Sequence, residues 1–205
     1  MKEAEKTEDG RHLRAMKTRY KIINSARHVF LREGFQNTTI KQIIEHAQIG
    51  YGTAYSHFDG KDDILIFLME DVMKEFFEIA HTPFFPSTRE EAKEIILGQI
   101  LRFLKIAETE RDIMKVFSEG IGISPIANEK WEDIRQGFIQ SITKDITYSQ
   151  RNGLARTDLK AEIAARMWFY ANEMYQWEIV FEKNKSPMEE IAETIVTIYV
   201  DAIYL

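Results

Sequence analysis

The sequence contains no cysteine, which excludes structural disulfides and thiolate chemistry. It has only four prolines among 205 residues, and its apolar residues recur mostly at spacings of three and four, a pattern that predicts an all-α protein. No apolar stretch approaches the roughly 18 residues that a membrane-spanning helix needs. The N-terminal segment is polar, mixed in charge and without the apolar core of a secretory signal. We therefore expect a cytoplasmic protein without a membrane partner.

Basic residues are concentrated near the N-terminus. The formal net charge of the chain is −6, but residues 11–61 contain nine Lys and Arg against three acidic residues. This window therefore carries +6, and the remainder of the chain carries −12. A basic end on an acidic body predicts that one end of the molecule meets a polyanion. A solvated helical surface is the alternative interpretation of this charge pattern.

Apolar periodicity divides the chain into three parts. Residues 1–16 are charged and lack periodicity, so we expect them to be disordered or to form an arm. Residues 17–62 contain three short amphipathic segments, and residues 63–205 contain about six longer ones. This organisation predicts an N-terminal three-helix domain, residues 17–62, plus a larger C-terminal helical domain, residues 63–205. The expected helices cover approximately residues 17–33, 40–47, 51–57, 61–80, 88–107, 109–118, 126–150, 158–182 and 186–204.

Several residues mark the expected helix ends. Gly34 is expected to end the first helix, as glycine commonly does at a helix C-terminus. Thr39 and Gln42 have the spacing of a capping box at the start of the second helix. Ser186 is expected to cap the last helix.

Residues 49–63, IGYGTAYSHFDGKDD, place glycines and aromatic residues inside an otherwise helical region. A short helix, a three-residue turn and another short helix, packed on a preceding helix, form a helix-turn-helix. The second helix of this motif inserts its N-terminal residues into the DNA major groove. Gly50 and Gly52 would let the backbone approach DNA closely, and Tyr51 would then reach the bases.

Other polar residues near this helix are candidates for contacts with the DNA backbone. Tyr55 and His57 can donate hydrogen bonds to phosphate oxygens. Lys61 begins the next helix, so its charge and the N-terminal amides of that helix are expected to hold one phosphate. Of Thr38 and Thr39, one is expected to cap a helix and the other to touch phosphate. The candidate DNA-binding residues are Thr38, Thr39, Gly50, Tyr51, Gly52, Thr53, Tyr55, Ser56, His57 and Lys61.

Residues 19–65 resemble the DNA-binding domain of the TetR family, the tetracycline-repressor-like transcription regulators. The resemblance implies an all-helical homodimer of about nine helices, whose N-terminal domain binds a palindromic operator in double-stranded DNA. It also implies that the larger C-terminal domain binds a small effector and dimerises through its last two long helices. The matching residues are Ala26, Phe30, Gly34, Phe35, Thr38, Thr39, Ile40, Ile43, Ile44, Ala47, Ile49, Gly52, Thr53, Tyr55, His57, Phe58, Lys61, Ile64 and Leu65.

Three positions depart from the family pattern. The family commonly has glycine at the first turn position and Ser or Thr at the third, where this sequence has Gln48 and Gly50. Tyr51 stands where Lys or Arg is common, and it cannot make a bidentate contact with guanine. We therefore expect less direct base readout, and more reliance on DNA shape and on a basic arm in the minor groove. The residues of that arm are Arg11, Arg14, Lys17 and Arg19.

Residues 158–182 are rich in aromatic side chains and methionine, and two interpretations stay open. These residues form core and dimer interface, or they line a small-molecule site, which needs apolar walls and a few polar groups. A site of the second kind suits a lipophilic or aromatic effector, and Glu173 would pair with a cation if it faces inward. The candidate ligand-binding residues are Met73, Phe77, Phe103, Met114, Phe117, Trp131, Phe138, Trp168, Phe169, Asn172, Glu173 and Tyr175.

The histidines lack metal-ligand spacing and no Ser-His-Asp arrangement is recognisable, so we expect no metal, no cofactor and no catalysis. The resemblance indicates a DNA-binding transcriptional regulator, specifically a repressor that a small effector releases from its operator. Such a protein would be nucleoid-associated while bound to DNA. Two other classes remain as alternatives: a helical adaptor that binds protein through the same motif, and an uncharacterised enzyme. DNA binding with a steep salt dependence would exclude the adaptor, because phosphate neutralisation releases counterions.

Overall fold

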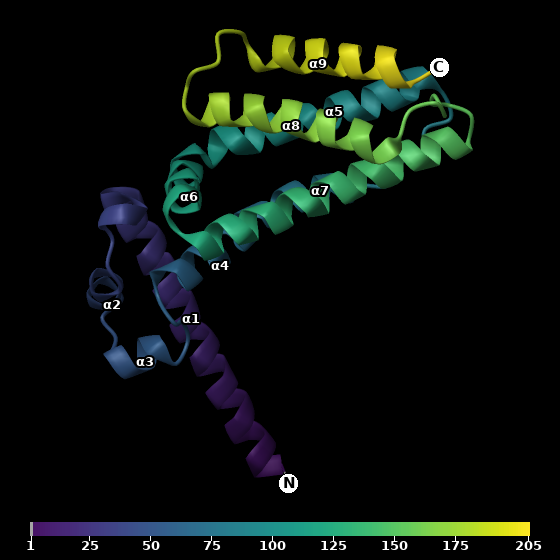
Figure 1. Cartoon of the computed structure of the whole chain (residues 1–205). Coiled ribbons are helices and arrows are strands. Elements are labelled where there is room, and N and C mark those ends of the chain that lie inside the picture. The colour runs from purple at the N-terminus through teal and green to yellow at the C-terminus, as the bar shows by residue number, and fades with distance from the viewer. Residues whose placement is uncertain (1) are drawn as a thin grey trace. The chain divides into compact units, whose positions relative to one another are not determined.

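The computed structural model describes the backbone of residues 2–205 and the side chains of residues 12–205, and these residues are mainly helical (Figure 1). This range contains no β-strand, only an isolated bridge between Ala155 and Tyr204. The prediction of an all-α fold is therefore confirmed. Its helices are α1 (Lys2–Asn37), α2 (Ile40–Ala47), α3 (Tyr51–Tyr55), α4 (Lys61–Ala80), α5 (Arg89–Thr109), α6 (Arg111–Ile123), α7 (Pro125–Arg151), α8 (Ala161–Val180) and α9 (Met188–Ile203).

The chain forms two compact units. The first contains Met1–Glu70 and Val116–Asn128, and the second contains Asp71–Lys115 and Glu129–Leu205. Helices α4, α6 and α7 therefore supply residues to both units. The expected division at residue 62 differs from this arrangement, because it left Val116–Asn128 out of the first unit. Val116–Asn128 is far from the rest of the first unit in the sequence and joins it only in the folded chain, so sequence order does not predict that it belongs there.

Helix α1 begins earlier than expected. The sequence predicted disorder or an arm over residues 1–16, whereas α1 runs from Lys2. The side chains from His12 to Lys17 are all exposed, so the described part of this extension is not held by packing. Lys, Arg, Ala, Leu and Met favour helix intrinsically, which accounts for a helix that the apolar pattern alone does not predict.

Gly34 interrupts α1, as the sequence predicts. Its φ of 76° and ψ of 168° lie in a region that is essentially restricted to glycine. The carboxylate of Glu119 on α6 accepts hydrogen bonds from the backbone N–H groups of Phe35 at 2.7 Å and Gln36 at 2.9 Å. A Cβ atom at Gly34 would lie 2.9 Å from this carboxylate. Glycine therefore supplies both the backbone turn and the space that Glu119 occupies.

The capping box predicted at Thr39 is present at the start of α2. The Thr39 hydroxyl accepts from the backbone N–H of Gln42 at 3.3 Å, and Gln42 Oε1 accepts from the backbone N–H of Thr39 at 2.7 Å. The helix then buries Ile43, Ile44 and Ala47 against the rest of the first unit. Both orphan donors at the helix start are thus satisfied locally.

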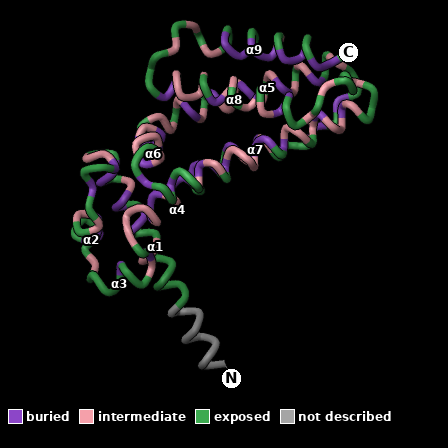
Figure 2. The backbone as a smooth tube through the Cα atoms, in the orientation of Figure 1, coloured by how far each residue is buried: buried purple, intermediate pink, exposed green. Residues whose placement is uncertain are grey.

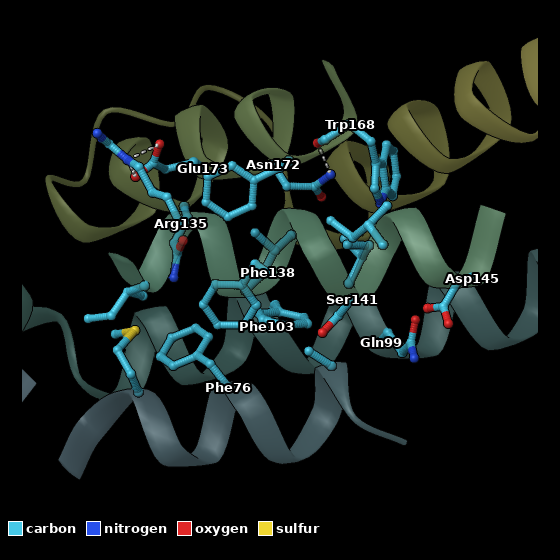
Figure 3. A pocket seen from close by; sticks show the side chains of 18 of the residues that line it. Phe76, Gln99, Phe103, Arg135, Phe138, Ser141, Asp145, Trp168, Asn172 and Glu173 are labelled. Atoms are coloured by element: carbon cyan, nitrogen blue, oxygen red, sulfur yellow. Dashed lines mark hydrogen bonds and ion pairs between the residues drawn. The ribbon is translucent and has the colours of Figure 1, made fainter. Parts of the chain in front are cut away.

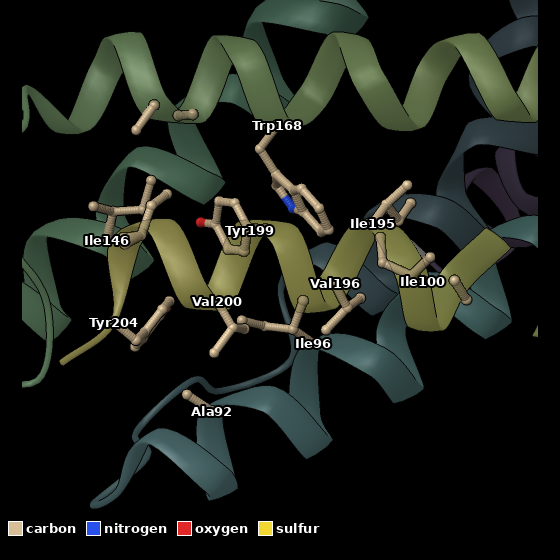
Figure 4. Packing of buried hydrophobic residues seen from close by; sticks show 14 of the residues in the cluster. Ala92, Ile96, Ile100, Ile146, Trp168, Ile195, Val196, Tyr199, Val200 and Tyr204 are labelled. Atoms are coloured by element: carbon tan, nitrogen blue, oxygen red, sulfur yellow. The ribbon is translucent and has the colours of Figure 1, made fainter. Parts of the chain in front are cut away.

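The core of the second unit lies where α5 packs against α8 and α9 (Figure 4). Ile96 and Ile100 project from α5, and Val200 projects from α9, all buried. The ring of Trp168 on α8 stacks on the ring of Tyr199 on α9 with centroids 4.0 Å apart. Burying each large apolar side chain contributes about 1.5–3 kcal/mol, so this cluster is a main source of stability for the unit.

The outer faces of α5, α8 and α9 are exposed (Figure 2).

At the start of α9, the prediction that Ser186 caps the helix is wrong. Pro187 is the N-cap residue, and no side chain caps the helix there. None of the described helices is both long and apolar enough to cross a membrane.

Candidate nucleic-acid interface and ligand pocket

Helices α2 and α3, separated by residues 48–50, form the helix-turn-helix that the sequence predicts. Ala54 and Phe58 are buried, whereas Tyr51 and Tyr55 are each 49% exposed. Residues four apart lie on the same helix face, so the two tyrosines form one exposed aromatic surface. Apart from its chain neighbours and the backbone of its own helix, nothing lies within 4 Å of the position that a Cβ on Gly52 would take. The start of α3 is therefore exposed and free of bulk, as an approach to base edges requires.

The turn accommodates the two unusual residues within it, Gln48 and Gly50. Gln48 adopts a left-handed conformation, with φ 49° and ψ 52°, and its backbone N–H donates to the Glu45 carbonyl at 3.1 Å. A non-glycine residue in this conformation costs on the order of 1 kcal/mol. Gly50 is the N-cap of α3, and no side chain caps the helix. The chain therefore forms the turn of a helix-turn-helix with these residues, at a small cost in conformational free energy.

Thr38 and Thr39 have different roles. Thr38 is 1% exposed, and its hydroxyl donates to the Gly34 carbonyl at 2.6 Å. A buried hydroxyl that is already hydrogen-bonded cannot reach a phosphate, so the expected phosphate contact is corrected for Thr38. Thr39 is the exposed helix cap. On the same surface, Thr53 is exposed, and the Ser56 hydroxyl donates to the Thr53 carbonyl at 2.7 Å.

Lys61 also differs from its expected role. Its ammonium donates to the backbone carbonyls of Phe35 at 2.7 Å, Gln36 at 3.2 Å and Thr38 at 2.8 Å. It also lies 4.5 Å from the centroid of the Phe35 ring. An ammonium group has three donors, and all three are used on these carbonyls. Lys61 therefore joins the start of α4 to the end of α1, and the predicted phosphate contact would compete with these three carbonyls.

Arg19, expected in the basic arm, supports α3 instead. Its Nη1 donates to the His57 carbonyl at 3.3 Å, and its guanidinium lies 4.5 Å from the Phe58 ring centroid and 4.8 Å from that of Phe67. His57 is partly buried beside it. Arg14 and Lys17 have exposed side chains on α1, while the Arg11 side chain lies outside the described residues.

The second unit contains an aromatic pocket between α4, α5, α7 and α8, with a cavity volume of about 80 Å³ (Figure 3). Phe77 stacks on Phe138 with centroids 4.2 Å apart, and Phe138 lies 5.8 Å from Phe103 and 6.0 Å from Phe169. Phe76 packs 5.5 Å from Phe103. The lining residues are Met73, Phe76, Ala80, Gln99, Ile100, Phe103, Leu104, Trp131, Ile134, Arg135, Phe138, Ser141, Ile142, Asp145, Trp168, Phe169, Asn172, Glu173 and Gln176.

Eight of the predicted ligand-binding residues line this pocket and four do not. Phe77 lies behind Phe138, and Phe117 belongs to the first unit. Met114 is fully buried and outside the lining. Tyr175 packs against the core of the second unit instead. Sequence spacing identified the aromatic residues but could not decide which of two adjacent rings faces the cavity.

Most of the polar residues that line the pocket are not among the predicted ligand-binding residues. Ser141 and Asp145 follow Phe138 along α7 at spacings of three and seven, which place them on one helix face. This helical spacing from Phe138 was the sequence signal that could have identified Ser141 and Asp145 as lining residues. Arg135 precedes Phe138 by three and has the same signal, but its pairing with Glu173, 38 residues away in the sequence, was not predictable.

Glu173 faces inward and pairs with a cation of the chain itself. It is 5% exposed, and it accepts from Trp131 Nε1 at 2.9 Å and from Arg135 Nε at 2.8 and 3.1 Å. Arg135 also pairs with Glu132. Burial lowers the pKa of Arg135, but the hydrogen bonds and charges of Glu173 and Glu132 outweigh burial, so the net pKa is raised. The charges of Glu173 and Arg135 are therefore satisfied by hydrogen bonds and ion pairs within the protein itself.

Two acceptors elsewhere in the pocket are less well satisfied. Asn172 donates through Nδ2 to the Trp168 carbonyl at 2.7 Å, but its Oδ1 is buried without a partner. Burial raises the pKa of Asp145 to about 7, against the opposing attraction of Lys144. Figure 3 shows Arg135 and Glu173 toward one end of the pocket, Asp145 toward the other end, and Asn172 between them.

Comparison with known proteins identifies the class of the helix-turn-helix. The family model described as bacterial regulatory proteins, tetR family, matches residues 22–66. The HTH-type transcriptional regulator HbdR of Aromatoleum sp. (strain CIB) is 36% identical over 58 residues, 28% of this chain but only 25% of that protein. The fatty acid metabolism regulator protein of Bacillus subtilis (strain 168) is 21% identical over 184 residues, 89% of this chain and 94% of that protein.

The fold is shared with the solved SmeT–triclosan complex. The TM-score is 0.72 at 17% identity, and the match covers 92% of each chain. The similarity therefore extends beyond the helix-turn-helix to the second helical unit. Residues 22–66 include the whole of α2 and α3 with the turn between them. Residues 22–66 therefore form a DNA-binding domain of the TetR type, and the chain resembles transcriptional regulators of that family.

Proposed function

We propose that this regulator is a repressor that binds a palindromic operator as a homodimer and leaves it when a small lipophilic or aromatic effector occupies the pocket. The observation that carries the proposal is the presence, on one chain, of an exposed Tyr51–Tyr55 surface and an aromatic cavity. Helix α4 contributes to both units: Lys61 anchors it in the first, and Phe76 lines the pocket in the second.

Two similar proteins have names that agree with a lipophilic effector. The relative in Bacillus subtilis is a regulator of fatty acid metabolism, and SmeT was solved with triclosan. The aromatic walls around Phe138 offer the apolar surface that such ligands need.

An apolar stripe on α8 supports the homodimer. Ile163, Met167, Tyr170 and Met174 follow one another at spacings of four, three and four, and all are more than 40% exposed. Ile198 on α9 is 63% exposed. An exposed apolar stripe at this spacing is suited to pack against the same stripe of a second copy, because a two-fold interface is self-complementary.

Release from DNA would follow from a population shift. Two recognition helices of a dimer must lie about 34–36 Å apart to enter successive major grooves. An effector that binds better to a state with a different separation draws the population away from the DNA-binding state. We expect α4 to carry this change, since its residues belong to both units.

The test is DNA binding by the purified protein, measured by fluorescence anisotropy on genomic fragments, with the mass of the free protein measured by light scattering. We expect a dimer, and an affinity that falls by about a thousandfold or more between about 50 and 200 mM salt. Such a fall reflects counterion release from phosphates. A monomeric protein, or one that ignores every fragment at low salt, would contradict the proposal and would revive the adaptor interpretation.

Tyr51→Ala is expected to change sequence preference more than overall affinity. The side chain is half-exposed at the start of α3, where it can touch a thymine methyl or donate to a base edge. Discrimination at the contacted base pair should fall by about 1–3 kcal/mol, measured by competition between operator variants. Tyr51→Phe is the matched control: it keeps the ring and separates methyl contact from hydroxyl donation. An unchanged preference in Tyr51→Ala would remove Tyr51 from base readout.

A further inference from the structure

Two polar groups that line the pocket are acceptors without partners. Among the described residues, Asn172 Oδ1 is buried and accepts no hydrogen bond. The partly buried carboxylate of Asp145 likewise makes no hydrogen bond or ion pair with any described side chain. An unpaired buried acceptor costs about 1–3 kcal/mol. Both groups line the same cavity, Asn172 from α8 and Asp145 from α7 (Figure 3).

The cation of the pocket is already neutralised. Arg135 donates to both carboxylate oxygens of Glu173 and also pairs with Glu132. Asp145 has no comparable partner, and the exposed Lys144 beside it offsets its burial only in part. The pocket therefore contains one uncompensated acidic group and no cation that is available to a ligand anion.

We propose that the effector is a lipophilic cation, an amine on a small aromatic body, whose N–H groups bind the Asp145 carboxylate and Asn172 Oδ1. This inference rests on the proposed function, because it assigns a chemical class to the effector of that pocket. The apolar body would lie against Phe103, Phe138 and Phe169, which wall the cavity. A charged donor is the complement of these two acceptors, since hydrogen bonds to an ionised group are the strong ones.

The charge pattern disfavours a ligand that ends in a carboxylate. Such an anion would be repelled by Asp145, and Arg135 would not be free to bind it, because Arg135 already pairs with Glu173.

The cavity volume limits the size of the ligand. At about 80 Å³, the cavity is smaller than the roughly 150 Å³ that holds a benzene ring. The pocket must therefore widen even for one ring, and a single-ring ligand is the appropriate probe.

The experiment uses three probes with the same apolar body: 4-phenylbutylamine, 4-phenylbutanol and 4-phenylbutyric acid. Their binding to the full-length protein is measured by isothermal titration calorimetry. We expect the amine to bind at least about tenfold more tightly than the alcohol, which corresponds to about 1.4 kcal/mol. The acid is expected to bind least well of the three.

Two variants and a control assign the effect to the two acceptors. Asp145→Asn should weaken amine binding by about tenfold or more and leave alcohol binding within about twofold. Asn172→Leu should weaken the amine and the alcohol together, because both lose an acceptor. Asp133→Asn is the matched control, since Asp133 is an exposed carboxylate on the same helix and outside the pocket lining. Folding of Asp145→Asn is not in doubt, because the change removes a desolvated charge.

The pH dependence gives an independent readout. Because burial raises the pKa of Asp145 to about 7, the carboxylate is mostly neutral at about pH 6 and mostly ionised at about pH 8. An alkylamine stays protonated over this range, as lysine does. The affinity for the amine should therefore rise by about tenfold from pH 6 to pH 8, and Asp145→Asn should abolish the rise.

The two tyrosines near Asp145 do not titrate in this window. Burial raises the pKa of Tyr199 well above its usual range and that of Tyr204 to about 12. Lys144 is exposed on the same helix. A pH-dependent affinity in this range therefore reports on Asp145.

The outcomes separate this inference from the proposed function. If the acid binds more tightly than the amine, or if the amine and alcohol bind equally, the cationic class is wrong. If none of the three probes binds to a protein that still binds DNA, the inference fails while the regulator assignment stands. If the amine binds as expected but never weakens DNA binding in the anisotropy assay, the ligand class holds and effector-controlled release fails.

Discussion

Lys61→Met is expected to lower the free energy of unfolding of the first unit by about 3 kcal/mol. The native ammonium donates to three backbone carbonyls, those of Phe35, Gln36 and Thr38. Hydrogen bonds that involve a charged group contribute about 1.5–3 kcal/mol each, but water can replace part of this at a partly exposed site. Methionine keeps the apolar stem against the Phe35 ring and supplies no donor. Urea unfolding followed by circular dichroism measures the loss.

Lys41→Met is the matched control for this change. Lys41 is an exposed lysine in the same unit and makes only a 3.8 Å pair with Glu45. Exposed pairs of this kind contribute about 0.2–1 kcal/mol, so the control should unfold close to the unmodified chain. If Lys61→Met unfolds like the control, the three carbonyl bonds do not stabilise the unit.

The same variant distinguishes a structural lysine from a phosphate ligand. If Lys61 touched phosphate, its removal would reduce the slope of log affinity against log salt by about 0.9. We expect that slope to stay unchanged at salt concentrations where the variant is folded. A normal stability together with a reduced slope would restore the original assignment of Lys61 as a DNA contact.

Glu173→Leu is expected to lower the free energy of unfolding by about 3–5 kcal/mol, the usual cost of removing one partner from a buried ion pair. Glu173 is 5% exposed and accepts from both Arg135 and Trp131. Leucine would leave the indole N–H of Trp131 unpaired and would leave Arg135 with Glu132 alone. Unfolding by urea, read through tryptophan fluorescence, measures the change in the second unit.

A double variant tests the physical cause. Arg135→Met combined with Glu173→Leu removes both charges, so we expect it to recover about 2 kcal/mol or more relative to Glu173→Leu alone. Glu162→Leu is the control on the same helix, since Glu162 is exposed and lies 3.9 Å from Arg166. It should cost about 0.5 kcal/mol or less. A double variant no more stable than the single one would show that packing, and not the unpaired charge, dominates the loss.

Features that depend on neighbours in the sequence were predictable. The capping box at Thr39 and the break at Gly34 were both identified from residues within one or two turns of helix. The exposed face of α3, with Tyr51 and Tyr55 four residues apart, follows from helical spacing in the same way. The aromatic content of the pocket was predictable as well, because apolar residues repeat along each helix at the period that places them on one side.

The partners of the long charged side chains were decided only by tertiary structure. Lys61 meets carbonyls 23 to 26 residues away, and Glu119 meets the backbone N–H of Phe35 from 84 residues away. Arg19 donates a hydrogen bond to the backbone carbonyl of His57, 38 residues away. The sequence by itself determined that this chain is helical, basic at one end and built around a helix-turn-helix, because those properties depend on local spacing and composition. Whether a given charge faces DNA, a ligand or the protein's own backbone was left to the folded structure, because that depends on which distant segments pack around it.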